Sequence, residues 1–374
     1  MRILVDYRPA LRQRTGVGEY IHELVRALAS HRTDEVSIFT SSWKDRPSPE
    51  LSAELGAHVI DCRIPVGLLN ALWHRAGWPP VEWLAGGADV VHAAHPLLIP
   101  SRHAAQVVTV HDLFFLTDPS AVGAEIRRDY ASLAAAHARR AHAVVTSSEY
   151  GRQQVIERLS APPARVHVVP PGAPSWRHLG ASPLPAPAGY ALFVGTIEPR
   201  KNLERLLDAW QRVVASLKTR PRLVLAGGVS SKSAPLLENL GAPGLAGTVE
   251  YRGYVPEAAR EALFAGARLL VLPSLDEGFG LPVLEAMSAG IPVVASNRGA
   301  IPEVAAGSAE LVEPLDVDAL AAALVRVLED EDHARDLARR GLERARAFTW
   351  QRSATILSAV YAEAIARRRA ESTS

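Results

Sequence analysis

The chain has 374 residues, of which 48% are hydrophobic and 22% are charged. This length allows two domains that each bury a core, and the composition is that of a folded globular protein. The chain has 41 lysines and arginines against 40 aspartates and glutamates, which gives a net charge of +1. It therefore lacks the excess of basic residues that is typical of nucleic-acid-binding proteins.

The single cysteine, Cys62, excludes an internal disulfide and a metal site with several cysteine ligands. The first residues, M-R-I-L-V-D-Y, lack the apolar segment of a signal peptide. No run of about 18 apolar residues predicts a membrane-spanning helix. We therefore expect a cytoplasmic protein, with peripheral contact at the inner face of a membrane as an open alternative.

Short apolar runs alternate with helical patterns along nearly the whole chain. Helices are predicted at 19–29 and 202–217, each with apolar residues at helical spacing on one face. Strands are predicted at 3–5, 36–40, 90–92, 107–110, 143–146, 166–169, 191–194, 223–226, 269–272 and 293–295. Because most of these runs are continuously apolar, they predict parallel strands buried on both faces, in doubly wound α/β sheets.

A proline-rich stretch without periodicity, 171–189, interrupts the pattern. We predict a first Rossmann-like domain over 1–178, a linker over 179–189 and a second Rossmann-like domain over 190–350. The helical tail, 351–374, either packs on the second domain or crosses back to the first. Ligands of open α/β sheets bind outside the carboxyl ends of the strands, so a cleft between the two domains is the expected site.

The segment S-L-D-E-G-F-G-L-P-V-L-E-A-M-S-A-G follows a predicted buried strand. Its glycines, Gly278 and Gly280, allow a tight turn, and Pro282 suits the first position of a helix. The amides of Gly278, Phe279, Gly280 and Leu281 would then lie unpaired at a helix N-terminus, where phosphate oxygens bind well.

Two glutamates flank this turn. Glu277 lies before the predicted helix and Glu285 about one turn inside it. Beside a bound diphosphate, one could hydrogen-bond a ribose hydroxyl and the other a hydroxyl of an attached sugar. The alternative is a glycine-rich turn in which Glu277 caps the helix and Glu285 is solvated.

The spelling E-G-F-G-L-P-V-L-E, with Glu277 and Glu285 at its ends, resembles the signature of the large family-four group of retaining glycosyltransferases. The resemblance extends along the whole chain in order. It implies the GT-B fold, with two Rossmann-like, doubly wound parallel-sheet domains facing a central cleft. It also implies transfer of a sugar from a nucleotide diphosphate sugar with retention of configuration.

Three other segments match this family. T-G-V-G-E-Y carries Gly16 and Gly18, in a loop that the family uses near the donor phosphates and the acceptor. V-T-V-H-D-L carries His111, whose counterpart in the family points at the donor sugar. F-V-G-T-I-E-P-R-K-N-L carries Arg200 and Lys201, whose counterparts clamp the pyrophosphate.

The third segment also departs from the family. Many members have arginine directly after its glycine, where this chain has Thr196, and we expect Arg200 to supply the guanidinium, as in the E-P-R-K-N branch. Two further loops are expected beside the nucleotide, one with Gly227 and one, near the base, with Tyr254 and Val255. Either loop could be a simple turn.

The resemblance implies no metal and no resident cofactor, because Lys201, Arg200 and the helix N-terminus would stabilise the leaving diphosphate. D-V-D (316–318) and D-E-D (330–332) match the metal-binding pattern of the other major glycosyltransferase fold. Both precede helical patterns, so we predict that their aspartates are helix caps and first-turn acids. Segment 227–233 lacks the glycine before lysine of a P-loop, and no G-x-G-x-x-G follows the first strand, which disfavours a dinucleotide oxidoreductase.

The E-P-R-K-N form resembles that of bacterial mannosyltransferases of surface polysaccharide assembly. GDP-mannose is therefore the first expectation for the donor and a UDP-hexose the second. The expected acceptor is a glycan or a lipid-linked glycan. A sugar-nucleotide isomerase and an inactive sugar-nucleotide-binding protein on the same fold are the alternatives.

A tryptophan-rich segment in the first half bears on the acceptor. It contains Leu68, Leu69, Trp73, Trp78 and Trp83. It predicts either a lipid-facing patch or a buried helix pair.

Overall fold

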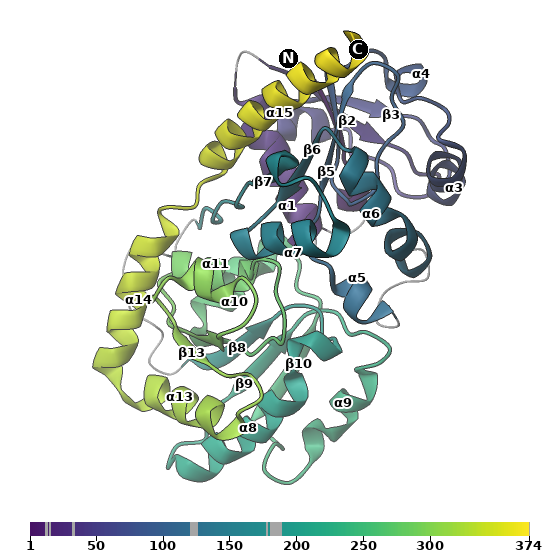
Figure 1. Cartoon of the computed structure of the whole chain (residues 1–374). Helices are drawn as coiled ribbons and strands as arrows, with labels where there is room; N and C mark the ends of the chain where they lie inside the picture. Colours follow the sequence, from purple (N-terminus) through teal and green to yellow (C-terminus); the bar gives the residue numbers. More distant parts are fainter. Residues whose placement is uncertain are drawn as a thin grey trace. The chain divides into compact units, whose positions relative to one another are not determined.

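The computed structural model describes residues 1–11, 14, 16–31, 34–119, 126–176, 179 and 189–373. The chain divides into two compact units, one of Met1–Gly172 with Thr349–Ser374 and one of Ala173–Phe348. Both are α/β units with helices around a parallel sheet (Figure 1). Of the linker predicted at 179–189, all but the two end residues lie outside the described residues.

The first unit contains a seven-stranded sheet in the order β3-β2-β1-β4-β5-β6-β7. Every neighbouring pair in it is parallel. The strands are β1 (Arg2–Asp6), β2 (Glu35–Thr40), β3 (His58–Asp61), β4 (Val90–Ala93), β5 (Ala105–Thr109), β6 (Ala143–Thr146) and β7 (Val166–Val168). The helices are α1 (Gly16–Ala29), α2 (Leu51–Leu55), α3 (Val66–Ala76), α4 (Glu82–Ala85), α5 (Phe114–Thr117), α6 (Ala131–Arg140), α7 (Glu149–Leu159) and α15 (Trp350–Thr373), with a π-helix, η3, at Ile126–Tyr130.

Helices cover both faces of this sheet because successive side chains of a strand point to opposite faces. In β1, Ile3 and Val5 pack with α1, α2 and α15, whereas Leu4 packs with α3, α6 and α7. The predicted doubly wound arrangement is therefore confirmed for this unit.

The C-terminal helix α15 packs on the first unit. Its residues Leu357, Val360 and Ala364 are buried in the same core as α1. A polar contact adds to this packing, since the Tyr361 hydroxyl lies 2.6 Å from Nδ1 of buried His92 in β4. Residues far apart in sequence thus complete one core.

The second unit contains a six-stranded sheet in the order β10-β9-β8-β11-β12-β13, again parallel throughout. Its strands are β8 (Tyr190–Val194), β9 (Leu223–Ala226), β10 (Val249–Gly253), β11 (Ala267–Leu272), β12 (Val293–Ser296) and β13 (Glu310–Val312). Its helices are α8 (Leu203–Ser216), α9 (Ala234–Glu238), α10 (Glu257–Ala265), α11 (Leu281–Ser288), α12 (Ile301–Ala305), α13 (Val317–Glu329) and α14 (Glu331–Ala345).

All ten predicted strands are present, but β3, β10 and β13 were not predicted. Each of the three lies at an edge of its sheet. Their residues are mostly half-buried or exposed, unlike the fully buried strands β4, β6 and β9. These three edge strands therefore lack the continuous apolar run by which the central strands, and the edge strand β7, were recognised.

Each sheet has one point where the strand order reverses direction. It lies between β1 and β4 in the first unit and between β8 and β11 in the second. Ligands of open α/β sheets bind at the carboxyl ends of the two strands that flank this switch point. The residues that follow these four strands are therefore the candidate ligand contacts.

Candidate functional site

The E-P-R-K-N segment follows β8 at the switch point of the second unit. A 3₁₀ turn, η5 (Pro199–Lys201), ends at Asn202, which has a left-handed backbone with φ of 60°. The Asn202 amide donates to the carbonyls of Pro273, after β11, and of Pro314, at 3.1 and 2.7 Å. This clamp ties the segment to the end of β11 and turns the Lys201 side chain inward, where the residue is only 6% exposed.

Glu277, in the loop after β11, is the partner of both basic residues. Its Oε1 accepts a 2.5 Å hydrogen bond from Lys201 Nζ and a 2.7 Å bond from the Ser274 hydroxyl. Its Oε2 accepts from Arg200 at 3.2 Å. Arg200 and Lys201, from the loop after β8, therefore both contact the carboxylate of Glu277, from the loop after β11. The three predicted residues lie together at the switch point.

The charge state of Glu277 follows from these contacts. Burial would raise the pKa of its carboxyl group, but the charges of Lys201 and Arg200 and the hydrogen bonds from Lys201 and Ser274 lower it below its ordinary value. Glu277 is therefore ionised at neutral pH. Among the described residues, Lys201 Nζ has only this carboxylate as a polar partner, so two of its three N–H donors stay available.

The loop from Glu277 to Leu281 leads into α11. Gly280, at the N-cap, has φ of 92°, a left-handed conformation that favours glycine and provides no capping side chain. The described residues supply no acceptor for the amides of Phe279, Gly280 and Leu281. α11 begins at Leu281, so Pro282 occupies the second helical position and not the predicted first. These buried or half-buried amides at the helix N-terminus are thus left without an acceptor in the described part of the chain, which is the condition for binding an anion there.

Glu285, the second predicted glutamate, lies on α11 and is only 7% exposed, which contradicts the solvated alternative. Arg260 of α10 donates to both of its oxygens, at 2.6 and 2.5 Å. Sequence reasoning did not identify Arg260, because nothing in its local pattern distinguishes it from the other arginines. It holds the Glu285 carboxylate in place beside α10.

The remaining predicted positions of this unit surround the ends of β8, β9 and β10. Thr196 and Tyr254 are exposed and Val255 is half-buried. Gly227 has φ of 145°, and a Cβ on it would lie 2.0 Å from the carbonyl oxygen of Gly195. Close packing of two strand ends therefore requires glycine there, independently of any ligand.

In the first unit, His111 follows β5, and Gly16 and Gly18 lie in the first turn of α1. Burial lowers the pKa of His111 to about 4, although Asp112 and a hydrogen bond with the Ala94 backbone act in the opposite direction. The imidazole is therefore neutral at pH 7. The ring packs edge-on against Tyr20 of α1, with 5.1 Å between ring centroids. His111 Nε2 and the Tyr20 hydroxyl are both buried without a hydrogen-bond partner among the described residues.

As predicted, the two D-x-D patterns supply helix caps, Asp316 and Asp330, and acids of the first helical turn, Asp318 and Asp332. Asp316 accepts from the Ala319 amide and Asp330 from the His333 amide, each at 2.9 Å. Within the described part of the chain, no group of three or more histidine, cysteine, aspartate or glutamate side chains is arranged to hold a metal ion.

The tryptophan-rich segment is partly buried and partly exposed, and its predicted contact with lipid stays a prediction. Leu69 and Trp73 of α3 are buried in the core. In contrast, Leu68, Trp78 and Trp83 are 55%, 50% and 58% exposed. Trp78 and Trp83 contact each other edge to face, and the Arg102 guanidinium lies over Trp83 at 4.9 Å. No helix among the described residues is long and apolar enough to cross a bilayer.

Each half of the chain matches a known protein family. Residues 14–176 match a family described as Glycosyltransferase Family 4, and residues 176–344 match one described as Glycosyl transferases group 1. O-antigen chain mannosyltransferase B of Escherichia coli is 32% identical over 377 aligned residues, covering 95% of this chain and 98% of the relative. A D-inositol 3-phosphate glycosyltransferase of Salinispora tropica is 29% identical, covering 97% of this chain and 84% of the relative.

A solved structure shares the whole architecture. Sucrose-phosphate synthase from Thermosynechococcus elongatus superposes with a TM-score of 0.74 over all of both chains, at 23% sequence identity. Together with the two parallel sheets, this likeness confirms the predicted GT-B fold.

Proposed function

Because the chain belongs to glycosyltransferase family four, a family of retaining enzymes, we propose that its second unit binds a nucleotide diphosphate sugar at the β8–β11 switch point. The diphosphate would lie between the amides at the start of α11 and the ammonium group of Lys201. We further propose that the transferred sugar is mannose, taken from GDP-mannose.

The observation that carries the proposal is the set of N–H donors that stay uncommitted at this switch point. Lys201 is buried and turned inward, yet two of its three donors have no acceptor among the described residues. The amides of Phe279, Gly280 and Leu281 are likewise without acceptors there. Donors fixed in advance around one place are the arrangement that stabilises charge developing on a leaving group.

In the proposed reaction, the bond between the sugar and the diphosphate breaks, and negative charge grows on the diphosphate. Charge-assisted hydrogen bonds from Lys201 and Arg200 contribute about 1.5–3 kcal/mol each, so no divalent metal is required. Glu277, held ionised by the same cations, would accept a hydroxyl proton of the donor sugar. Glu285, oriented by Arg260, would accept one from the ribose.

Retention is proposed to follow front-face attack, in which the leaving phosphate accepts the acceptor's proton and no protein nucleophile takes part. The proposed role of His111, which rests on the family resemblance, is to orient the transferred sugar. Its neutral imidazole fits this role, since Nε2 is free among the described residues to hydrogen-bond a hydroxyl.

The choice of mannose rests on the E-P-R-K-N segment and on the 32% identity to a relative named as an O-antigen chain mannosyltransferase. A thermal-shift screen of GDP, UDP and ADP, with and without their sugars, tests the donor. We expect GDP and GDP-mannose to raise the melting temperature most, since a ligand that binds only the folded state stabilises it. Selective stabilisation by UDP would replace GDP-mannose with a UDP-hexose, and no stabilisation by any nucleotide would contradict the site.

The acceptor is proposed to be a glycan that can be lipid-linked, with Leu68, Trp78 and Trp83 resting on the membrane surface. Exposed tryptophans suit the membrane interface, and the nearby Arg102 suits anionic lipid. A variant with Trp78→Ser and Trp83→Ser should sediment less with phosphatidylglycerol vesicles than the wild type. Equal sedimentation would remove this surface from the proposal.

A further inference from the structure

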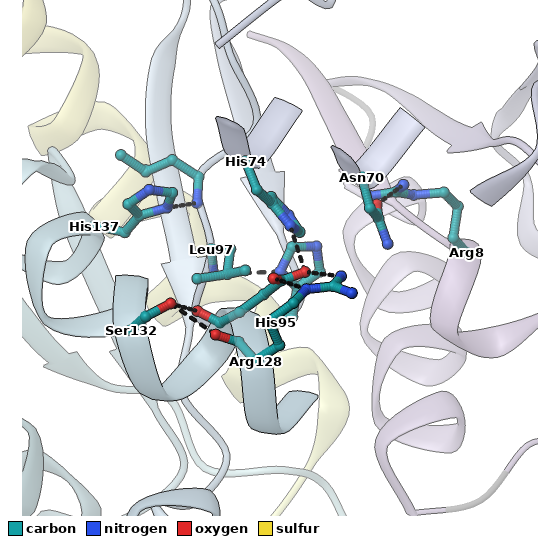
Figure 2. A network of polar contacts seen from close by, with 10 residues as sticks. Arg8, Asn70, His74, His95, Leu97, Arg128, Ser132 and His137 are labelled. Atoms are coloured by element: carbon teal, nitrogen blue, oxygen red, sulfur yellow. Dashed lines mark hydrogen bonds and ion pairs between the residues drawn. The ribbon is translucent and has the colours of Figure 1, made fainter. Parts of the chain in front are cut away.

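The switch point of the first unit holds a buried polar cluster that the proposed donor site does not use. Figure 2 shows three of its residues, Arg8, His74 and His95. Asp6 ends β1, and its carboxylate accepts from Arg8 Nε at 2.8 Å and Nη2 at 2.7 Å. His95, two residues after β4, accepts from the Leu97 amide through Nδ1, so Nε2 carries the proton and donates to Asp6 at 3.2 Å. This bond joins the ends of β1 and β4.

A second acid extends the cluster. Asp129, in η3, accepts from Arg128 Nε and Nη2 at 2.6 and 2.8 Å, and His74 Nδ1 of α3 lies 3.4 Å from its Oδ2. The rings of His74 and His95 are 6.5 Å apart between centroids. We name Asp6, Arg8, His74, His95 and Asp129 the switch-point cluster.

One atom of the switch-point cluster lacks a partner. His74 Nε2 is buried without a hydrogen bond among the described residues, and the side chain is only 4% exposed. Burial, together with His95, lowers the pKa of His74 despite the opposing effect of Asp129, so the ring is neutral at pH 7. With its proton on Nδ1 toward Asp129, Nε2 presents a lone pair. Such a buried, unpaired acceptor is unfavourable until a donor reaches it.

The charges of the cluster indicate the kind of ligand. Asp6 is paired with Arg8 of the cluster, and Asp129 with the neighbouring Arg128, so each cluster carboxylate faces a guanidinium. The cluster contains no lysine, in contrast to the Lys201 site of the second unit. An anion would therefore find little attraction, whereas a hydroxyl group can donate to the free imidazole nitrogen.

We propose that the switch-point cluster binds the acceptor as a neutral, hydroxyl-rich sugar, and that His74 Nε2 accepts a hydrogen bond from one of its hydroxyls. The proposal rests on the proposed function and adds to it the place and chemical class of the acceptor. Asn70, whose side-chain oxygen accepts from Arg8 at 2.8 Å, positions that guanidinium and not the ligand.

Two substitutions of His74 separate ligand binding from a structural role. The amide nitrogen of asparagine can occupy the place of Nδ1 and donate to Asp129, whereas the amide oxygen of glutamine can occupy the place of Nε2 and accept from a hydroxyl. The full chain is assayed with the donor selected by the thermal-shift screen and with p-nitrophenyl α-mannoside and α-glucoside as acceptors. We expect His74→Asn to raise the acceptor KM about tenfold, the loss of one hydrogen bond, and His74→Gln to stay within about twofold of the wild type.

The opposite ranking, in which His74→Asn is tolerated and His74→Gln is not, would show that His74 serves only Asp129 and would overturn the proposal. His142→Gln is the matched control, because His142 is buried at the amino end of β6, away from the switch point. If the wild type cleaves the donor in water but neither glycoside accelerates nucleotide release, the acceptor proposal fails alone. If the wild type cleaves no nucleotide sugar at all, the proposed function fails instead.

Discussion

The two units place a buried ion pair at the same topological position, yet the two pairs are built differently. At the β8–β11 switch point, Lys201 and Arg200 converge on Glu277, which also accepts from Ser274. At the β1–β4 switch point, Arg8 donates hydrogen bonds to both carboxylate oxygens of Asp6, and His95 donates one more. Both pairs join loops that follow two neighbouring strands.

The difference lies in what each pair leaves uncommitted. In the second unit, an ammonium group and a row of helix amides keep free N–H donors, which suits an anion. At the switch point of the first unit, Arg8 and Arg128 each pair with a carboxylate, and His74 Nε2 is a buried acceptor without a partner among the described residues. We therefore propose that one fold holds a charged ligand in one copy and a neutral ligand in the other.

The largest expected effect is on turnover. Lys201→Ala should lower kcat by roughly 10²–10³, the cost of losing one partner of a developing negative charge. Nucleotide release measures it, and Lys218→Ala, which changes an exposed lysine of the same unit, should leave kcat unchanged. Excess EDTA should not alter the wild-type rate. Near-normal turnover of Lys201→Ala would remove this lysine from the site.

Equivalent substitutions at the two switch points should show that nucleotide stabilises only the second unit's site. Asp6→Asn and Glu277→Gln each leave a buried cation without its anion, which should reduce the free energy of unfolding by about 3–5 kcal/mol. The nucleoside diphosphate chosen by the screen should restore much of the loss in Glu277→Gln, because its phosphates replace the carboxylate beside Lys201. It should restore none of the loss in Asp6→Asn. Urea unfolding with and without nucleotide measures both, and equal rescue would contradict the assignment.

Acid should affect the first unit before the second. Burial lowers the pKa of His22, His111 and His137 to about 4 and that of His92 to about 3, from 6.5. The folded state then binds fewer protons than the unfolded state, so each histidine costs about 1.4 kcal/mol per pH unit as pH falls from about 6.5 toward its folded pKa. The second unit has no buried histidine among its described residues.

Hydrogen exchange followed by mass spectrometry, corrected for intrinsic rates, measures this difference at about pH 7 and about pH 5. Protection should fall first in the peptides of β1, β4 and α1. Earlier loss of protection in β8 or β11 would show that the buried histidines do not determine acid stability.

Much of the fold could be predicted from sequence, and for a clear reason. Central strands such as β4 and β9 are buried on both faces, so their hydrophobic runs are unbroken. The edge strands β3, β10 and β13 were missed because they are half-exposed. At the candidate site, Lys201 and Glu277 were predicted from their motifs, but Arg260 was not. Its partner Glu285 is 25 residues away, and no local pattern links them.

By itself the sequence determined which segments form parallel strands, where the glycine turn before α11 lies, and which residues carry the family motifs. These are local properties, because they follow from runs of hydrophobic residues, from the positions of glycines and from the short spacings between motif residues. Only the tertiary structure decided which polar side chains are paired. Lys201 pairs with Glu277, 76 residues away in the sequence, and His95 with Asp6, 89 residues away. Such partners are set by the order of strands in a sheet, because parallel strands bring residues from distant loops to the same edge.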